Sequence, residues 1–354
     1  MKKKLLAILL TTVMAVSVTG CGGADDNKET TTAKNEKTTA GQTTTGADAP
    51  TEVVPPTPEL ATPEELPAQP FAHITFDGEV DEGYKAVTQA TKAADSAGDG
   101  ANFDIVDATD AVLTYEEGPV GKCLFIDGKF GLDLGLKPTN TDQYTVSFWM
   151  NAERLATFGP TLQVGYNMHR VDNSGNNVTW FNVTQCEWGD ATLTDGGRIF
   201  PMVWSRSETG DAADGTDCWP WMATFDNTVK GKKEWVMVTI VCTGEEQVSP
   251  VTGATYVGAE YYVNGMKYYD SADNFTNHTY WAEWTWDATL APNIMKPTEG
   301  AVFQSYFGIN YWDTILKGYV DDLYVYDTAL TPGQVATLYN LGNKDCKTGV
   351  EAAQ

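Results

Sequence analysis

The sequence of 354 residues has few basic side chains, with 23 Lys and Arg against 48 Asp and Glu, for a formal net charge of −25. A binding face for nucleic acid, anionic lipid head groups or polyanionic glycans needs clustered Lys and Arg. The excess of acidic residues therefore argues against nucleic acid, anionic lipids and polyanionic glycans as partners. It is compatible with neutral polysaccharides, cations and basic proteins.

Histidine and cysteine are also scarce. The three histidines, His73, His169 and His278, stand far apart, and no Cys-x-x-Cys pair or Cys/His cluster indicates zinc. Five cysteines follow Cys21, an odd number, so at least one is unpaired or pairs between chains.

Two of these cysteines, Cys186 and Cys218, lie in one long insertion, where they either form a disulfide or remain reduced, because spacing alone does not fix their separation. Cys123 and Cys242 fall in strand patterns and are expected to be small core residues.

The chain has a single long apolar run, residues 5–18, which follows three lysines and is too short to span a bilayer. It predicts a secretory signal. The run ends in Val18-Thr19-Gly20-Cys21, which resembles the lipobox of bacterial lipoproteins. The resemblance implies that residues 1–20 are removed, that Cys21 becomes the acylated (palmitate-bearing) N-terminus, and that the protein is lipid-anchored on the outer side of the membrane at the bacterial cell surface. In the alternative, an ordinary secreted protein, Cys21 is there by chance.

Residues 21–70 are rich in Thr, Pro and acidic residues and poor in aromatic and large apolar ones. Such a composition buries too little surface to offset the entropy of ordering, so the segment is predicted to be a disordered linker. It would hold the following domain, residues 71–346, away from the membrane, and residues 347–354 would form a C-terminal tail.

The domain is expected to be all-β. Residues 144–151 alternate between two kinds of side chain, as a strand with two different faces does. Residues 235–242 are apolar nearly throughout, which predicts a strand buried on both sides. Asp127-Gly128 and Asn264-Gly265 are dipeptides typical of hairpin turns.

Helical signals are convincing only near the C-terminus, in the stretch GYVDDLYVYDTALTPGQVATLYN from Gly318. Its first part alternates as a strand and places Asp321 on the face of Leu323 and Val325. Thr331, Pro332 and Gln334 then predict a helix with a capping box.

This stretch resembles the C-terminal signature of LamG-like jelly-roll domains, members of the concanavalin A-like lectin/glucanase superfamily. Six further segments are similar to that family in order, beginning with AHITFDG at Ala72 and including QYTVSFWMNAE at Gln143. The resemblance implies an antiparallel jelly-roll β-sandwich with long loop insertions and one short C-terminal helix. It does not fix the function, because lectins, binding modules and glycanases share the fold.

Most of the eleven tryptophans lie in or beside two inserts, residues 159–222 and 270–297. A pyranose ring packs its apolar face on an indole, while its hydroxyls bond to neighbouring polar groups. The aromatics either form such a carbohydrate platform or pack the loops onto the sandwich. The residues predicted to bind carbohydrate are Trp281, Trp284 and Trp286, then Tyr311 and Trp312, with Glu283 and Asp287 at the rim.

An enzyme is the main alternative. Glycanases on this fold carry catalytic carboxylates at alternate positions of one strand, and the sequence has no such run. Glu116-Glu117 and Glu245-Glu246 are adjacent pairs expected in turns, and Glu283 is the one acid to watch. An adhesin that binds a protein partner is a third class.

Calcium is common in this superfamily near the first and last strands, so Asp77 and Asp321 either bind a structural Ca²⁺ or cap the backbone. The sequence thus predicts a surface lipoprotein that binds a neutral polysaccharide or oligosaccharide without cleaving it. Such a protein would supply partner hydrolases or transporters.

Overall fold

The computed structural model describes residues 58–78, 82–91, 103–139, 141–154, 159–166, 178–186, 198–206, 234–248, 255–270, 295–297, 299, 302–343 and 345–348. For 178–186, 198–206 and a few strand ends only the backbone is described. None of the described helices is long and apolar enough to cross a membrane.

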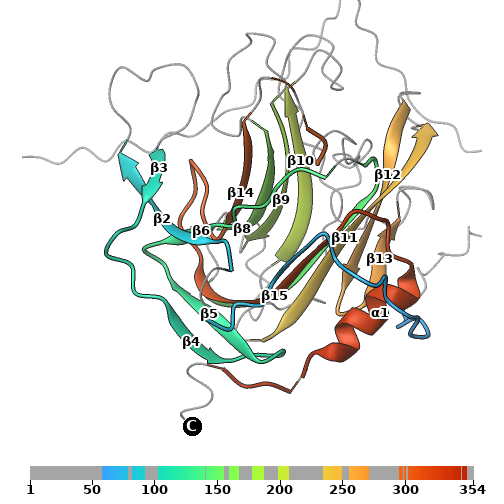
Figure 1. The fold of residues 1–354 in the computed structure, drawn as a ribbon, viewed down its shortest axis with the longest axis horizontal. Helices are drawn as coiled ribbons and strands as arrows, with labels where there is room; N and C mark the ends of the chain where they lie inside the picture. The colour runs from blue at the N-terminus through green and yellow to red at the C-terminus, as the bar shows by residue number, and fades with distance from the viewer. Residues whose placement is uncertain are drawn as a thin grey trace, which may run out of the picture. The chain divides into compact units, whose positions relative to one another are not determined.

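The described strands form two sheets, and every recorded pairing is antiparallel (Figure 1). The eight-stranded sheet runs, in spatial order, through β13 (Met266–Asp270), β12 (Thr255–Val263), β11 (Val236–Val248), β7 (Tyr144–Arg154), β15 (Lys317–Tyr326), β5 (Lys122–Asp127) and β4 (Thr114–Glu117), with β1 (Ala72–Ile74) paired to β15. The seven-stranded sheet runs through β10 (Arg198–Arg206), β9 (Val178–Cys186), β8 (Gly159–Tyr166), β14 (Phe303–Phe307), β6 (Gly131–Asp133), β2 (Lys85–Thr91) and β3 (Phe103–Asp107).

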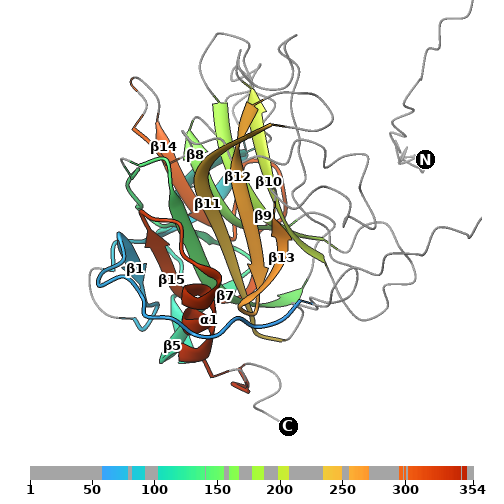
Figure 2. The same cartoon turned by 90° about the vertical axis from the view of Figure 1, so that its right-hand side faces the viewer.

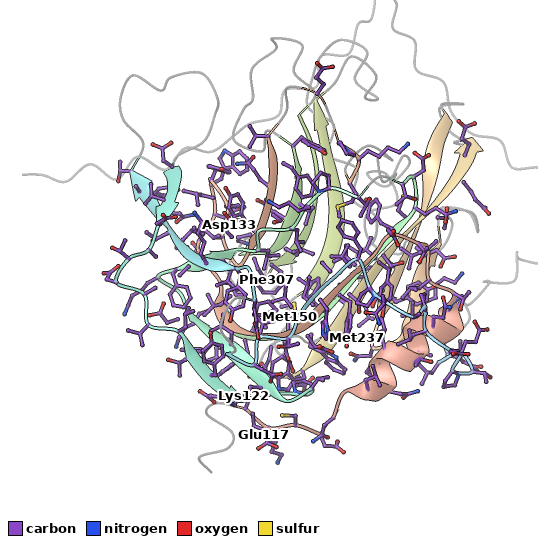
Figure 3. The ribbon with its side chains drawn as sticks, viewed as in Figure 1. Glu117, Lys122, Asp133, Met150, Met237 and Phe307 are labelled. Atoms are coloured by element: carbon purple, nitrogen blue, oxygen red, sulfur yellow. The ribbon has the colours of Figure 1, made fainter. Side chains whose placement is uncertain are left out.

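The main core lies between the two sheets. Phe148 of β7 meets Phe307 of β14 edge-to-face, with ring centroids 5.3 Å apart. Figure 3 places Phe307 and Met150 in this space. The predicted fold, an antiparallel jelly-roll sandwich with one short C-terminal helix, is confirmed.

A second apolar layer covers the outer face of the eight-stranded sheet. Helix α1 (Pro332–Leu341) packs Val335 and Leu338 against Trp149, Trp235 and Met237. Strand β11 therefore contributes one set of side chains to each layer, as its nearly continuous apolar sequence predicted.

The helix start is confirmed in detail. Thr331 accepts a hydrogen bond from the backbone N–H of Gln334, and the Gln334 side chain accepts one from the backbone N–H of Thr331. Pro332 occupies the first turn, where its missing N–H is not needed.

The two predicted hairpin turns have different outcomes. Asn264-Gly265 joins β12 to β13 with φ angles of 52° and 77°, as a type I′ turn requires. Asp127-Gly128 joins no hairpin, because β5 belongs to the eight-stranded sheet and β6 to the other. The apolar run after this turn crosses between the sheets and buries Phe130 in the core.

The face predicted for Asp321 is wrong. Strand β15 has a register shift between Asp321 and Tyr324, and Asp322 takes a left-handed φ of 50°. This bulge adds one residue, so Leu323 points to the core whereas Asp321 lies on the outer face opposite Trp149.

Residues 58–70, which the sequence assigns to the linker, lie along α1 as an extended strap (Figure 2). Glu64 donates its N–H to the carbonyl of Gly333 at 3.1 Å, and its own carbonyl accepts from Thr337 Oγ1 at 2.6 Å. Leu66 packs into the outer apolar layer. Leu66 and these hydrogen bonds together dock this end of the predicted linker.

Candidate functional site

Many of the predicted site residues lie outside the described residues. These are Trp281, Glu283, Trp284, Trp286, Asp287, Cys21 and Cys218. For Cys186 only the backbone, in β9, is described, so the predicted pairing of Cys186 with Cys218 stays a prediction. Tyr311 and Trp312 are described, and they define the candidate site.

The loop Asn310–Asp313 is fixed by its own side chains. Asn310 Oδ1 accepts from the backbone N–H of Trp312 at 3.0 Å and of Asp313 at 2.6 Å, and Nδ2 donates to Asp313 Oδ2 at 2.6 Å. This is the local bonding with which Asn stabilises tight turns. Burial raises the pKa of Asp313, although the hydrogen bond from Asn310 opposes the shift.

Strands β2 and β3 hold the same loop from the side. Gln89 Nε2 donates to the carbonyl oxygens of Asn310 at 2.8 Å and Asp313 at 2.7 Å. The N–H of Phe103 donates to the carbonyl of Tyr311 at 3.2 Å. Strands β2 and β3 therefore both hold the backbone of the loop that carries Trp312.

The two aromatic residues of the loop have different environments. The Tyr311 ring is buried, and it meets the Trp312 ring at 65° with 5.7 Å between centroids. Trp312 is partly buried against apolar neighbours that include Tyr311, so part of its indole reaches the surface. Tyr311 therefore contributes its hydroxyl to a hydrogen-bond network, whereas Trp312 contributes an aromatic surface to the site.

Strand β14 supplies a polar network beside this loop. Gln304 Nε2 donates to Tyr311 OH at 2.7 Å and to Tyr306 OH at 3.3 Å, and the two hydroxyls are 3.2 Å apart. Burial raises the pKa of both tyrosines, so both are neutral phenols at physiological pH. Because Phe307 and Ser305 face the other sheet, Gln304 and Tyr306 lie on the outer face.

The register extends this outer face across the sheet. Tyr306 lies opposite Gln163 of β8 on one side and Asp133 of β6 on the other. Figure 3 labels Asp133 on this sheet, at the side near β6 and β2. Gln163 Oε1 is buried and has no hydrogen-bond partner among the described residues, and the same is true of Thr161 Oγ1. Buried acceptors of this kind are normally satisfied by protein, water or ligand.

A glycine lies in the next set of paired residues across the strands of this sheet. Gly165 of β8 lies opposite Gln304 on one side, and on the other the backbone register continues to Trp180 of β9 and Trp204 of β10. Glycine inside a strand weakens the strand and often marks close approach of a ligand or of another backbone.

The predicted metal residues lie on either side of one turn. Asp77 Oδ1 accepts from the N–H of Lys122 at 2.6 Å, and Asp321 Oδ2 accepts from the N–H of Val120 at 2.8 Å. Both side chains thus hold the turn between β4 and β5.

These residues do not fit a calcium cage. Calcium takes six to eight oxygen ligands, whereas no group of three or more His, Cys, Asp or Glu residues converges among the described residues. Asp321 Oδ1 is buried and also has no hydrogen-bond partner among them. Burial raises the pKa of Asp321 to about 9, reinforced by the charges of Asp322 and Asp77 and opposed by the Val120 N–H, so the carboxyl is neutral at pH 7.

Three further residues of this face, Gln163, Gln304 and Tyr306, were not predicted from the sequence. The signal for the last two is the alternation in FQSYF from Phe303, where polar side chains interrupt core residues directly before the Tyr311-Trp312 pair. Nothing in the sequence alone pairs β8 with β14. The acidic pairs Glu116-Glu117 and Glu245-Glu246 lie in β4 and β11, not in turns as expected.

No family model matches this chain, and no curated protein matches it. Solved structures that it resembles include domain 4 of AbnA, a GH43 extracellular arabinanase from Geobacillus stearothermophilus, in complex with arabinotriose. The identity is 21%, the match covers 77% of this chain and 98% of that chain, and the TM-score is 0.45.

Two other matches are more distant. The CBM40 of the Ruminococcus gnavus IT-sialidase, bound to α2,3-sialyllactose, is 13% identical, with 64% and 98% of the two chains covered and a TM-score of 0.36. The SAP-like pentraxin of Limulus polyphemus is 12% identical, with 74% and 84% covered and a TM-score of 0.31. The strand pairing within this chain itself defines the fold.

Proposed function

We propose that this protein binds a neutral polysaccharide or oligosaccharide, without cleaving it, on the outer face of its seven-stranded sheet around Trp312. The observation that carries this proposal is the loop Asn310–Asp313, which its own side chains and Gln89 hold in place. It presents Trp312 beside the network of Gln304, Tyr306 and Tyr311. A partly exposed indole on a fixed backbone is suited to the apolar face of a sugar ring.

The polar groups of this face suit the hydroxyls of a sugar. Neutral phenols and amides both donate and accept hydrogen bonds, as sugar hydroxyls also do. Gln163 Oε1 and Thr161 Oγ1 are buried beneath this face, so a bound sugar would reach these two acceptors only through water or after a side-chain movement. The formal charge of −25 favours a neutral glycan over an anionic one.

Binding at a few such contacts is expected to be weak. One stacked ring contributes about 1 kcal/mol, and a handful of hydrogen bonds adds a similar amount each. A dissociation constant of about a millimolar to a micromolar follows for one site. Many copies on one cell would bind a single polymer much more firmly through avidity.

The cellular role rests on the sequence alone. A lipid anchor at Cys21 and a linker would place the domain at the bacterial cell surface, where it would hold polymer for neighbouring hydrolases or transporters. The sequence also predicts Trp281, Trp284 and Trp286 as stacking residues, with Glu283 and Asp287 as hydrogen-bonding groups at the rim of a carbohydrate site.

Affinity electrophoresis through gels that contain single neutral polysaccharides tests the proposal. At least one polymer should retard the protein, and Trp312→Ala should reduce that retardation. Phe71→Ala removes an exposed aromatic ring outside this site and should leave it unchanged. Release of reducing ends that Glu283→Gln abolishes would identify a glycoside hydrolase instead. Absence of retardation across the panel, together with capture of one protein partner, would identify an adhesin.

A further inference from the structure

Two cysteines that are far apart in sequence share one hydrogen-bond acceptor. Cys123 Sγ lies 3.5 Å from the carbonyl oxygen of Glu117, and Cys346 Sγ lies 3.6 Å from the same atom. The distance between the two sulfurs therefore cannot exceed the sum of these two distances. Both are free thiols in this structure.

The C-terminal tail is held at this point by further contacts. Thr348 Oγ1 donates to the Glu117 carbonyl at 3.0 Å and accepts from Trp235 Nε1 at 2.8 Å. The N–H of Asn343 donates to the carbonyl of Pro119 at 2.8 Å. Figure 3 places Glu117 and Lys122 at the lower edge of the molecule, where this turn lies.

The turn itself is also held by Asp77 and Asp321, whose side-chain oxygens accept hydrogen bonds from the N–H groups of Lys122 and Val120. Cys123 belongs to strand β5 and is fully buried, whereas Cys346 lies after α1 and is partly exposed. Any movement that closes the remaining distance between the sulfurs therefore falls to the tail.

We propose that Cys123 and Cys346 form an intrachain disulfide when the protein meets a low-molecular-weight disulfide such as oxidised glutathione. The Cys346 thiolate attacks one sulfur of the oxidant, forms a mixed disulfide and releases the first glutathione thiol. The Cys123 thiolate then attacks Cys346 Sγ and releases the second. Two protein thiols and one small disulfide become one protein disulfide and two small thiols.

The local chemistry sets the rate of this exchange. Burial raises the pKa of both thiols. At Cys123 the charges of Glu116 and of Asp321, once that carboxyl is ionised, add to the effect, whereas at Cys346 the hydrogen bond with Thr348 opposes it. The thiolate is the attacking species, so oxidation is slow at neutral pH and accelerates as the pH rises.

Cys242 provides an internal comparison. It belongs to the core between the sheets, and its Sγ contacts the carbonyl of Asp142 at 3.5 Å. Burial raises its pKa to about 12. This thiol shares no acceptor with either partner and is expected to stay reduced in the folded protein.

Incubation of the folded full-length chain with oxidised glutathione at pH 8, alkylation of the remaining thiols, and mass mapping of peptides under non-reducing conditions test the proposal. The expected product is a linked Cys123–Cys346 peptide pair that lacks two hydrogen atoms. The oxidised protein should melt several degrees higher than the reduced protein, because the bond closes a long loop.

Two variants make the result specific. Cys346→Ser changes a partly exposed residue, should fold, and should lose both the linked peptide and the shift in melting temperature. Cys242→Ser should retain both. The proposal is overturned if Cys346 ends as a stable glutathione adduct, pairs with another cysteine, or is recovered alkylated together with Cys123 after equilibration.

Discussion

Gly342 lies against the indole of Trp149, so close that a Cβ at position 342 would stand 2.8 Å from Trp149 Cε2. The ring of Tyr339 also stacks on Trp149, with an angle of 20° between the ring planes and 5.5 Å between the centroids. Trp149 is buried on the outer face of the eight-stranded sheet. The last turn of α1 is thus fixed to the sheet through one tryptophan.

Replacing Gly342 by Ala should destabilise the protein for steric reasons alone. Its φ of −84° suits any residue, so backbone strain makes no contribution. Overpacking of this kind costs about 1–3 kcal/mol. Urea unfolding of the wild type and of Gly342→Ala measures it. Trp149→Phe removes part of the indole, so Gly342→Ala should cost less in that background. An equal cost in both backgrounds would show that the clash is not with Trp149.

Thr331→Ala should weaken the helix start and the strap together. Thr331 Oγ1 accepts the Gln334 N–H at 3.2 Å and donates to Glu64 Oε2 at 2.5 Å. Loss of an N-cap oxygen costs about 0.5–2 kcal/mol. Thr109→Ala, at an exposed position after β3, is the matched control and should have little effect. If both variants unfold at the same urea concentration as the wild type, the cap contributes nothing measurable.

Stability should fall as pH rises above about 4 because of Asp321. The folded protein keeps this carboxyl protonated up to pH about 9, whereas the unfolded chain releases the proton near pH 4. The unfolded state therefore binds fewer protons between these values, and the unfolding free energy decreases by at most about 1.4 kcal/mol per pH unit. Asp321→Asn should flatten this dependence and should be at least as stable as the wild type at pH 8. A steeper loss of stability in the variant would contradict the assignment.

Removing the strap should destabilise the domain. Leu66 is partly buried, and Glu64, Glu65 and Thr337 contribute hydrogen bonds between the strap and α1. A chain that begins at residue 71 should lose about 2 kcal/mol relative to one that begins at residue 58. Thermal unfolding of both, with the full chain as reference, provides the comparison. Equal melting temperatures for the two shortened chains would place the true start of the domain at residue 71.

The parts of the fold that were predictable depend on neighbours in sequence. The capping box of α1 needs only Thr331 and Gln334, and the type I′ turn needs only Asn264 and Gly265. Strand β11 was evident because both of its faces are apolar. The spacing of apolar residues along the sequence directly indicates such local structure.

The parts that were not predictable depend on pairing between distant segments. The bulge at Asp322 breaks the alternation that placed Asp321 inward, and no local residue announces it. Asp127-Gly128 has the sequence of a hairpin turn, but the strands that it connects, β5 and β6, pair in different sheets. The strap was hidden because its two leucines are diluted in a long polar segment.

The candidate site was predictable only in part for the same reason. The adjacent Tyr311 and Trp312 stood out in the sequence, but Gln163 reaches their surroundings only through the register of β8 with β14. The burial of Tyr311 likewise follows from its packing against Tyr306, five residues earlier.

Isothermal titration with an oligosaccharide cut from whichever polymer retards the protein tests the central claim most directly. The account predicts saturable binding to the wild type and to Phe71→Ala, and a dissociation constant about tenfold higher for Trp312→Ala, which corresponds to about 1.4 kcal/mol. An unchanged dissociation constant for a correctly folded Trp312→Ala variant would contradict it.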